Sequence, residues 1–436
     1  MADFATRYGA DCRAFVERLL SFASTPGDEA AVQAFVRGHL DALGFETYEW
    51  TADPERLADH DSFPDDPAEI STTDRPSVAG VLELGSGKGR TLVLNGHVDV
   101  VPARYSSGGE ERASDAVPAN ERQWESDPFT PTWDGEDLTA RGAADMKSGL
   151  AACVYAARAL GDRAEAGEVD VDGRVVVESV AGEEEGGIGA AAAALDSPYP
   201  FGRDAAIIAE PTELTPVVAS EGSLMVELEL TGRSAHAATR WRGESVLPHF
   251  ERVRAALDDF ETEREESVTH PLYEAFPVAW PVVVGTVRAG EWASTVPDHL
   301  VAEARVGVAP GETVAEVETA LREHLASLAD ADPWLADHLS MDRSGIQFEA
   351  SEISPDEPVV RAVQAGMATH GLADDEPRGV TYGADARHYV EAGVPTVLFG
   401  PGSIEEAHFP DETIHWPDVE RAGAVLSAAA AVYLSS

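Results

Sequence analysis

Short apolar runs of strand type alternate with amphipathic helical patterns through the first half of the chain. Strands are predicted at about 45–50, 78–84, 91–96, 174–181 and 205–209. Helices are predicted over 11–24, over the stretch from Val32 to Leu43, and over 150–160. This alternation is typical of the α/β fold class, in which helices cover a central sheet. The polar stretches 53–76 and 103–123 are predicted to be surface loops, the second an insertion near the end of the third strand.

The pattern changes near Ser220, where strands alternate with longer amphipathic helices. Strands at 224–230, 282–287, 300–308 and 346–350 and helices near 244–260 and 313–329 follow the order β-α-β-β-α-β. That order predicts a ferredoxin-like α+β sandwich inserted into the first domain. The first domain resumes with a helix at 357–370, a strand at 395–399 and a last helix from about Pro417. The predicted domains are therefore 1–219 together with 354–436, and the inserted 220–353.

The chain carries a large negative charge. Its 436 residues include 79 Asp plus Glu against 31 Lys plus Arg, a formal net charge of −48, and lysine occurs only at Lys88 and Lys147. Repulsion of this size opposes compaction at low ionic strength and is screened when the Debye length falls to about 3 Å at 1 M salt. We therefore predict a halophilic protein; adaptation to a strongly cationic partner is the alternative. No basic stripe is present to neutralise phosphates, so nucleic acid is not expected as a partner.

Cysteine usage and hydropathy indicate what kind of protein this is: one without a disulfide framework or a membrane-spanning helix. Cys12 and Cys153 lie in apolar helical patterns and are expected to be core residues rather than a disulfide framework. The first residues show no basic stretch followed by an apolar one, and no apolar run reaches the roughly 20 residues of a spanning helix. We expect a soluble, cytoplasmic protein without a membrane partner.

A histidine and an aspartate stand where the apolar run 92–96 must end. His97 and Asp99 follow this run, and Pro102 cannot continue a central strand. In open α/β sheets, ligands bind at the carboxyl ends of strands. A His-x-Asp at this position suits one metal ligand, His97, whose imidazole Asp99 would orient. A structural histidine at a strand end is the alternative.

Other metal-capable side chains follow the later strands. Glu183, Glu184 and Glu185 follow the strand 174–181, Glu210 follows 205–209, His408 comes after 395–399, and Asp145 precedes the helix at 150–160. Taken singly, Asp145 would complement a helix dipole, and three consecutive glutamates would form a solvated turn. As a set, two histidines and several carboxylates are the nitrogen and oxygen donors that zinc takes, and one bridging carboxylate would hold two ions.

Several motifs make the chain resemble a known family. They are Gly96-His97-Val98-Asp99-Val100-Val101-Pro102, Arg141-Gly142-Ala143-Ala144-Asp145-Met146-Lys147, Glu183-Glu184-x-Gly-Gly, Glu210-Pro211-Thr212, Gly232-Arg233-Ser234-Ala235-His236, and Gly400-Pro401-Gly402 ahead of His408. In these motifs and their order the chain is similar to the two-zinc amidohydrolases that include acetylornithine deacetylase, succinyl-diaminopimelate desuccinylase, aminoacylase and carboxypeptidase G. The resemblance extends from about residue 11 to the C-terminus.

The resemblance implies a zinc-exopeptidase-like catalytic domain, with a central mixed sheet flanked by helices, and an inserted ferredoxin-like lid that also forms a dimer interface. It further implies two bound Zn²⁺ ions, for which Co²⁺ or Mn²⁺ would substitute. His97 and Glu210 would bind one zinc ion. Glu184 and His408 would bind the other, and Asp145 would bridge the two.

The same resemblance assigns the remaining roles. Asp99 would support His97, and Glu183 would be the general base and acid for a water activated by the metals. The peptide bond between Asp145 and Met146 is expected to be cis, as in such enzymes. His236, in the inserted domain, would reach the active site of the partner subunit in a homodimer and stabilise the oxyanion.

The predicted function is hydrolysis of the amide bond of an N-acyl amino acid, as in acetylornithine deacetylase or succinyl-diaminopimelate desuccinylase. A dipeptidase or carboxypeptidase-type exopeptidase, which would use the same site on a short peptide, is the alternative. A third hypothesis, from a different class, is a metal-dependent binding protein without catalysis; it would be expected to have lost Glu183 or a ligand, and neither is lost.

Several positions depart from the family pattern. Ser294 stands where the family has an asparagine that contacts substrate, and Gly182 stands where it often has an aspartate. Because Glu185 makes a third acid, a one-residue shift, with Glu184 as the base and Glu185 as the ligand, stays open. Arg305 and Arg387 are candidate clamps for a substrate carboxylate, with surface or interface ion pairs as the alternative.

Overall fold

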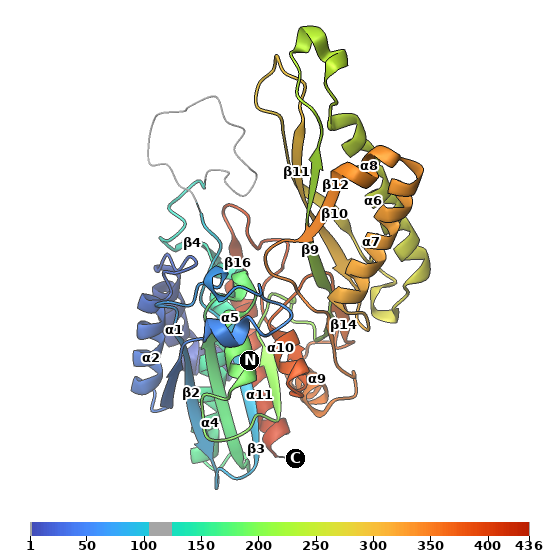
Figure 1. The fold of residues 1–436 in the computed structure, drawn as a ribbon. Coiled ribbons are helices and arrows are strands. Elements are labelled where there is room, and N and C mark those ends of the chain that lie inside the picture. Colours follow the sequence, from blue (N-terminus) through green and yellow to red (C-terminus); the bar gives the residue numbers. More distant parts are fainter. Residues whose placement is uncertain (1, 104–123, 436) are drawn as a thin grey trace.

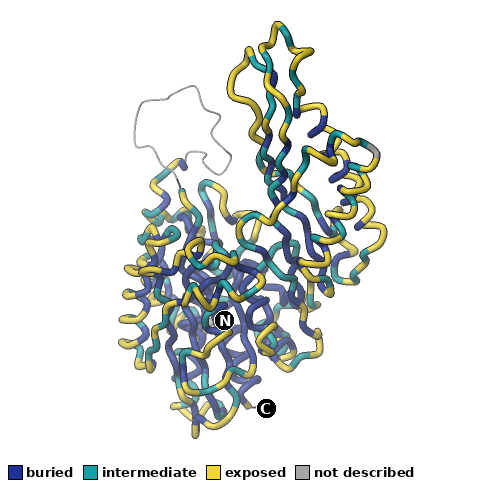
Figure 2. Tube along the Cα trace, in the orientation of Figure 1, coloured by how far each residue is buried: buried dark blue, intermediate teal, exposed yellow. Residues whose placement is uncertain are grey.

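The computed structural model describes residues 2–103 and 124–435 (Figure 1). The predicted insertion at 103–123 therefore lies outside the described residues, apart from Ala103. The described chain forms two bodies, each with its own sheet and its own apolar core. Figure 2 shows that buried backbone is concentrated in the larger body, whereas the outer helices and strand tips of the smaller body are mostly exposed.

The larger body is built on a mixed sheet, as the α/β pattern predicts. Its strand order is β1-β2-β6-β3-β7-β15-β8-β13, with β14 beside β8. The strands span Glu46–Trp50 (β1), Ser77–Leu84 (β2), Arg90–His97 (β3), Gly173–Val180 (β6), Ala205–Ile208 (β7), Val217–Ser220 (β8), Ser351–Glu352 (β13), Arg378–Val380 (β14) and Thr396–Leu398 (β15). Because β6, β3, β7 and β15 are parallel neighbours, their carboxyl ends meet at one edge of the sheet.

Helices flank this sheet and complete its core. They span Ala2–Leu20 (α1), Ala30–Ala42 (α2), Ser148–Glu165 (α4), Ile188–Leu195 (α5), Pro358–Thr369 (α9), Ala386–Glu391 (α10) and Trp416–Leu434 (α11). The alanine-rich α4 and α11 pack against β3 and against each other, since small side chains allow a close approach. Cys12 and Cys153 are buried and free, as predicted.

Two predicted boundaries in this body differ from the structure. The first helix begins at Ala2 rather than near residue 11, because Phe4 continues its apolar face and packs on Gly423 of α11. The segment 53–76, predicted to be a loop, contains two short helical turns, α3 (Pro54–Leu57) and η1 (Pro67–Glu69). In both turns an aspartate caps the first turn and a proline stands at its start.

The smaller body has the predicted β-α-β-β-α-β order. Its antiparallel sheet has the order β10-β11-β9-β12. The elements span Gly222–Thr231 (β9), Leu247–Ser267 (α6), Val282–Ala289 (β10), His299–Val308 (β11), Val314–Ala331 (α7), Pro333–His338 (α8) and Leu339–Arg343 (β12). Alternate residues of β9 and β11 are buried against α6 and α7. The start of α7 is fixed by a capping box between Thr313 and Glu316.

The last strand of this sheet was predicted in the wrong place. The prediction was 346–350, where apolar and polar residues alternate, but the structure forms the strand at Leu339–Arg343. Ile346 and Phe348 pack on the larger body instead, whereas Ala350 packs against the core of the smaller body. Ile346 lies against Gly186, and the ring of Phe348 lies 4.1 Å from the guanidinium of Arg387. At Ile346 and Phe348 the alternation therefore reflects a contact between the two bodies, and the segment joins the second sheet through an isolated β-bridge between Phe348 and Ser223 of β9.

A third, small sheet joins two distant parts of the chain. It has the order β16-β5-β4, with strands at Thr132–Asp134 (β4), Asp137–Thr139 (β5) and Thr413–His415 (β16). It places the segment just before Asp145 next to the segment just after His408. In the part of the chain that the structure describes, no helix has the length and apolar character needed to cross a bilayer.

Candidate functional site

Three neighbouring strands end at the same edge of the large sheet, and each delivers a polar side chain there. His97 is the last residue of β3. A short turn, η4 (Glu183–Glu185), follows β6, and Glu210 follows β7. Since β3 lies between β6 and β7 and runs parallel to both, the three side chains gather at their carboxyl ends.

Two further residues reach this edge from other elements. Asp145 lies in η3 (Ala143–Lys147), the irregular turn that leads into α4, and the peptide bond from Asp145 to Met146 is cis, as predicted. His408 lies in the loop after β15 with a backbone φ of 65°, a left-handed conformation that is uncommon for a residue with a Cβ atom.

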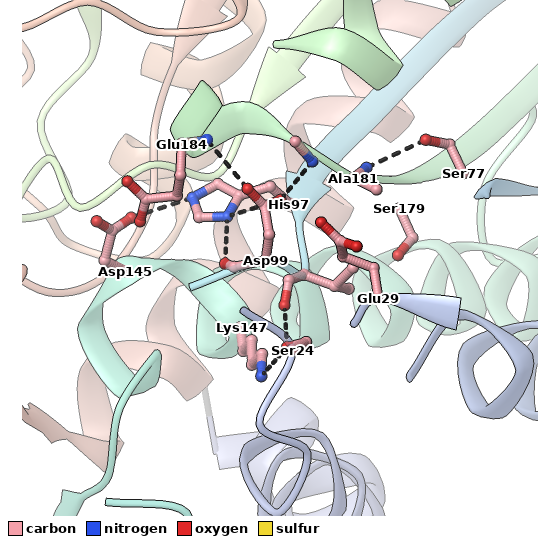
Figure 3. A network of polar contacts seen from close by, with 12 residues as sticks. Ser24, Glu29, Ser77, His97, Asp99, Asp145, Lys147, Ser179, Ala181 and Glu184 are labelled. Carbon is pink, nitrogen blue, oxygen red and sulfur yellow. Dashed lines mark hydrogen bonds and ion pairs between the residues drawn. The ribbon is translucent and has the colours of Figure 1, made fainter. Parts of the chain in front are cut away.

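The five side chains form two overlapping groups that share Asp145. His97, Asp145 and Glu210 make up one group, and Asp145, Glu184 and His408 make up the other; in each, the ligand atoms lie within 4.8 Å of one another. The two oxygens of Asp145 face different imidazoles. Its Oδ1 lies 3.2 Å from His97 Nε2, and its Oδ2 lies 3.2 Å from His408 Nε2. Glu184 Oε1 lies 3.1 Å from His408 Nε2, and Figure 3 shows Glu184, Asp145 and His97 converging.

Burial and mutual charge shift the pKa values of these groups strongly. Burial raises the pKa of Glu210 to about 8, helped by the charge of Asp145 and opposed by that of His97. Burial would lower the pKa of His408, but its hydrogen bonds with Asp145 and Glu184 outweigh this effect and raise the pKa to about 10. The pKa of His97 is raised well above its usual range in the same way. The site thus crowds several carboxyl groups around two imidazoles, and the direction of these pKa shifts reflects that excess of negative charge.

This arrangement fits a pair of divalent cations. Each group offers one imidazole nitrogen and carboxylate oxygens, the donors that Zn²⁺, Co²⁺ and Mn²⁺ take. Glu210 Oε1 is buried and has no hydrogen-bond partner among the described residues, an expensive state that a cation would relieve. Asp145, with one oxygen toward each group, is placed as a bridging ligand would be. The second group is the more open one, since the His408 side chain is 49% exposed.

Asp99 lies beside His97, but it acts mainly on the neighbouring turn. His97 Nδ1 donates its hydrogen bond to the backbone carbonyl of Asp99, at 2.9 Å, while the Asp99 carboxylate lies 3.7 Å from that nitrogen. The carboxylate oxygens instead accept the backbone N–H groups of Gly182 (2.9 Å) and Glu184 (3.0 Å). One residue therefore orients the imidazole and holds the glutamate turn next to it (Figure 3).

The three consecutive glutamates point to different places. Glu184 contacts His408, whereas Glu185 pairs with Arg75, whose guanidinium also binds the buried Glu29. Glu183 belongs to neither metal-capable group. Its pKa is raised well above the usual range, because it is shielded from water and lies near the carboxylate of Asp385. The structure thus places Glu184, and not Glu185, against the second imidazole.

Several residues that hold the site are absent from the predicted set. Arg75 lies in a polar stretch whose sequence gives no sign of its role. The buried Lys147 donates to the carbonyls of Leu19 and Phe22 and to Ser24 Oγ, which anchors the turn after Asp145 to the end of α1. The sequence could have pointed to this role of Lys147, because lysine is rare in the chain and otherwise occurs only at Lys88. Glu412, also buried, is described below.

The predicted oxyanion residue and a predicted substrate contact lie together on the smaller body. The backbone N–H of Ala237 donates to the carbonyl of Ser294, and His236 forms a β-bridge with Thr295. The yellow-green turn that follows His236 lies at the end of the small sheet that is distant from the large sheet (Figure 1). Among the described residues, no hydrogen bond or ion pair joins His236 or Ser294 to the two metal-capable groups. Both side chains are exposed.

The two predicted arginine clamps have protein partners. Arg305 Nη1 lies 3.1 Å from Glu221 Oε1, and Arg305 Nη2 donates to the carbonyl of Thr381 at 3.4 Å. The first of these contacts is an ion pair at the junction of the two sheets, the alternative named above. Arg387 is buried, stacks on Phe348 and donates to the carbonyl of Gly186, behind the glutamate turn. Neither guanidinium extends freely toward the metal-capable groups.

Comparison with known proteins adds relatives of known activity. The chain is 24% identical over 409 residues to N-formyl-4-amino-5-aminomethyl-2-methylpyrimidine deformylase of Bacillus subtilis (strain 168). This alignment covers 88% of this chain and 84% of the deformylase. Over 343 residues it is 28% identical to acetylornithine deacetylase of Proteus mirabilis (strain HI4320), which covers 77% of this chain and 78% of that protein.

Solved structures show the same fold. Human carnosine dipeptidase 1 superposes with a TM-score of 0.72 at 16% identity and covers all of this chain and 98% of its own. An M20 family metallo-carboxypeptidase from Sulfolobus solfataricus gives a TM-score of 0.70 at 16% identity, covering 98% of this chain and 99% of its own. The family model described as peptidase family M20/M25/M40 matches residues 114–431. The chain thus belongs to peptidase family M20/M25/M40, a family of metal-dependent enzymes, and is a hydrolase of amide C–N bonds.

Proposed function

We propose that this chain is a two-zinc deacylase that cleaves the amide bond of N-acyl amino acids. The observation that supports this proposal most strongly is the sharing of Asp145 between two groups of metal donors. His97 and Glu210 would hold one ion, Glu184 and His408 the other, and Asp145 both. The similarity to acetylornithine deacetylase over most of the chain supports an N-acyl amino acid as substrate.

Each residue at the site has a part in the proposed reaction. Bound divalent ions would lower the pKa of a water molecule toward 7 and polarise the substrate carbonyl. A carboxylate oxygen of Glu183 takes the proton of this water as the water oxygen bonds to the carbonyl carbon. The same carboxyl group then gives the proton to the amide nitrogen as the C–N bond breaks, so that a carboxylic acid and an amine leave. Asp99 keeps His97 and the glutamate turn in place.

Metal removal should abolish the activity. We expect the protein to lose its hydrolysis of the best substrate after treatment with a chelator and dialysis, and to regain it as Zn²⁺ or Co²⁺ is added up to two equivalents per chain. The measurement is a titration of initial rate against added metal. Undiminished turnover in the chelated protein, or full recovery at one equivalent, would contradict the two-metal proposal.

A panel of substrates separates the deacylase from its rival. Initial rates should be measured on N-acetylornithine, N-succinyl amino acids, an N-formyl aminomethylpyrimidine and unblocked dipeptides. A deacylase gives its highest kcat/KM on an acylated amine, whereas an exopeptidase or dipeptidase prefers the free peptides. The formyl compound belongs in the panel because of the similarity to the deformylase.

We also propose a cytoplasmic homodimer formed through the smaller body. Its β10 is an edge strand whose Val283 and Val287 side chains are 51% and 48% exposed, and such an apolar edge is suited to pairing with another chain. In this dimer the partner subunit's His236 would stabilise the oxyanion.

Charges on that edge should therefore separate the subunits. The variant V283K/V287K should sediment as a monomer and lose most of its kcat, since lysines disfavour strand pairing and the partner's His236 would be lost. L195K, which changes a 43% exposed apolar residue on α5, is the control and should stay dimeric and active. A native chain that sediments as a monomer at full activity would contradict the proposal.

A further inference from the structure

A buried ion pair lies behind the two loops that carry Asp145 and His408. Arg141 and Glu412 are 1% and 0% exposed, and Arg141 Nη1 lies 2.8 Å from Glu412 Oε2. The two residues are 271 positions apart in the sequence. Each is nonetheless close in sequence to a metal-capable residue, because Arg141 precedes Asp145 and Glu412 follows His408 by four positions.

The carboxylate of Glu412 holds the backbone from which Asp145 extends. Its Oε1 accepts the N–H groups of Ala144 (2.8 Å) and Asp145 (3.0 Å). Its Oε2 accepts the N–H group of Gly142 (3.1 Å) in addition to the Arg141 guanidinium. Both oxygens are therefore used by one short turn. Hydrogen bonds to a charged acceptor are the stronger ones, so this turn has little freedom.

The guanidinium of Arg141 holds the other loop. Its Nη2 donates to the carbonyl of His408 and its Nη1 to the carbonyl of Phe409, each at 3.3 Å. His408 is the residue with a φ of 65°, and a strained backbone of this kind persists only where its surroundings enforce it. The hydrogen bonds from Arg141 to the carbonyls of His408 and Phe409 help to hold this backbone conformation.

The small third sheet brings the two partners together. β5 pairs with β16 so that Leu138 lies opposite Ile414, and the N–H of Ala140 donates to the carbonyl of Glu412 at 3.0 Å. The ion pair thus closes a connection between two chain segments whose separation sets the distance from Asp145 to His408.

We propose that Arg141 and Glu412 are positioning residues that set the separation of Asp145 and His408, and thereby the affinity of the group Asp145, Glu184 and His408 for a divalent cation. This inference rests on the proposed two-metal function. Neither side chain belongs to the groups of metal donors; both act through the backbone of residues that do. Loss of the outer partners of metal ligands typically lowers metal affinity by about 10–100-fold.

Two variants divide the effect between the two loops. In E412Q the side-chain amide can no longer accept all four hydrogen bonds, so the turn that carries Asp145 loosens. Because Asp145 belongs to both groups of metal donors, both Co²⁺ affinities should fall, by about 10–100-fold. In R141K the ammonium keeps the charge opposite Glu412 but cannot reach both carbonyls of the His408 loop. Only the Co²⁺ affinity of the group Asp145, Glu184 and His408 should then fall. The measurement is a calorimetric Co²⁺ titration, with visible absorption to report the geometry of each ion.

A matched control and a metal-free readout complete the test. Glu312 in the smaller body also accepts hydrogen bonds from an arginine, Arg264 (2.8 Å), and from a backbone N–H, that of Ala309 (3.1 Å). The variant E312Q should lower thermal stability yet bind Co²⁺ as the native chain does. In the metal-free protein, the amide hydrogens of Ala144 and Asp145 should exchange slowly in the native chain and in R141K, and fast in E412Q.

The outcomes distinguish this proposal from the function on which it rests. Native Co²⁺ affinities in both E412Q and R141K, or an equal loss in E312Q, would overturn the positioning role. A native chain that binds no Co²⁺ would overturn the proposed function. In that case amide exchange in E412Q still tests Glu412: slow exchange at residues 144 and 145 would overturn its positioning role, and fast exchange would support that role.

Discussion

Replacing Glu183 with glutamine is expected to lower kcat by about 10²–10⁴-fold while both metal ions still bind. Glutamine has nearly the same shape but cannot take a proton from water or return it to the leaving nitrogen. Because Glu183 belongs to neither group of metal donors, its replacement leaves all five proposed ligands in place. Steady-state kinetics on the best substrate, together with a Co²⁺ titration of the same sample, checks both parts of the prediction.

Glu185 provides the matched control for this variant. It lies two positions away in the same turn, and its carboxylate faces Arg75 rather than His408. We expect E185Q to lose some stability, through the lost ion pair, and to keep its metals and its kcat within a few-fold. Loss of metal in E185Q would instead support the shifted assignment, with Glu184 as the base, and native turnover in E183Q would remove Glu183 from the mechanism.

The second large effect concerns salt. We expect the chain to be folded and active in molar KCl, and to lose its activity and its thermal stability in dilute buffer. With a formal charge of −48, the folded chain suffers strong self-repulsion at 0.1 M salt, where the Debye length is about 10 Å, and far less at 1 M, where it is about 3 Å. Activity and circular-dichroism melting curves over this range of KCl give the measurement.

Two controls separate charge screening from other effects of salt. Sorbitol at the same osmolality excludes general stabilisation by solute and should not replace KCl. The variant E251K/D259K/E266K changes three exposed acids of α6 that have no ion-pair partner among the described residues. It should remain folded at a lower salt concentration than the native chain. Full activity of the native chain in dilute buffer would contradict the prediction of a halophilic protein.

Much of the fold follows from local patterns. The predicted strands of the large sheet and the long helices of both bodies are present, because burial on one or both faces imposes a period that the sequence shows. The prediction failed at 346–350, where alternation of period two arises from packing of Ile346 and Phe348 on the other body. Periodicity records which side chains are buried but not what buries them.

The metal-capable residues of the candidate site could be predicted from the sequence, but the partners of its arginines could not. The five proposed ligands stand at strand ends or a helix start, and the structure brings them within reach of two shared groups. Their individual roles stay predictions. For Arg305 and Arg387 the sequence left two kinds of partner open, a substrate carboxylate or an ion pair within the protein, and in the structure their guanidiniums contact Glu221 and the carbonyl of Gly186. The partner of a long charged side chain depends on its neighbours in space, which spacing along the chain does not show.

By itself, the sequence determined the family, the α/β class, the inserted β-α-β-β-α-β unit and the set of residues able to bind metal, because each of these depends on residue types at characteristic positions. Only the tertiary structure decided that Asp145 turns one oxygen to each imidazole, that Glu185 leaves the site for Arg75, and that Glu412 holds the Asp145 turn. These features join segments as far as 271 residues apart. Contacts over such separations follow from how the sheets pair and pack, which local sequence does not specify.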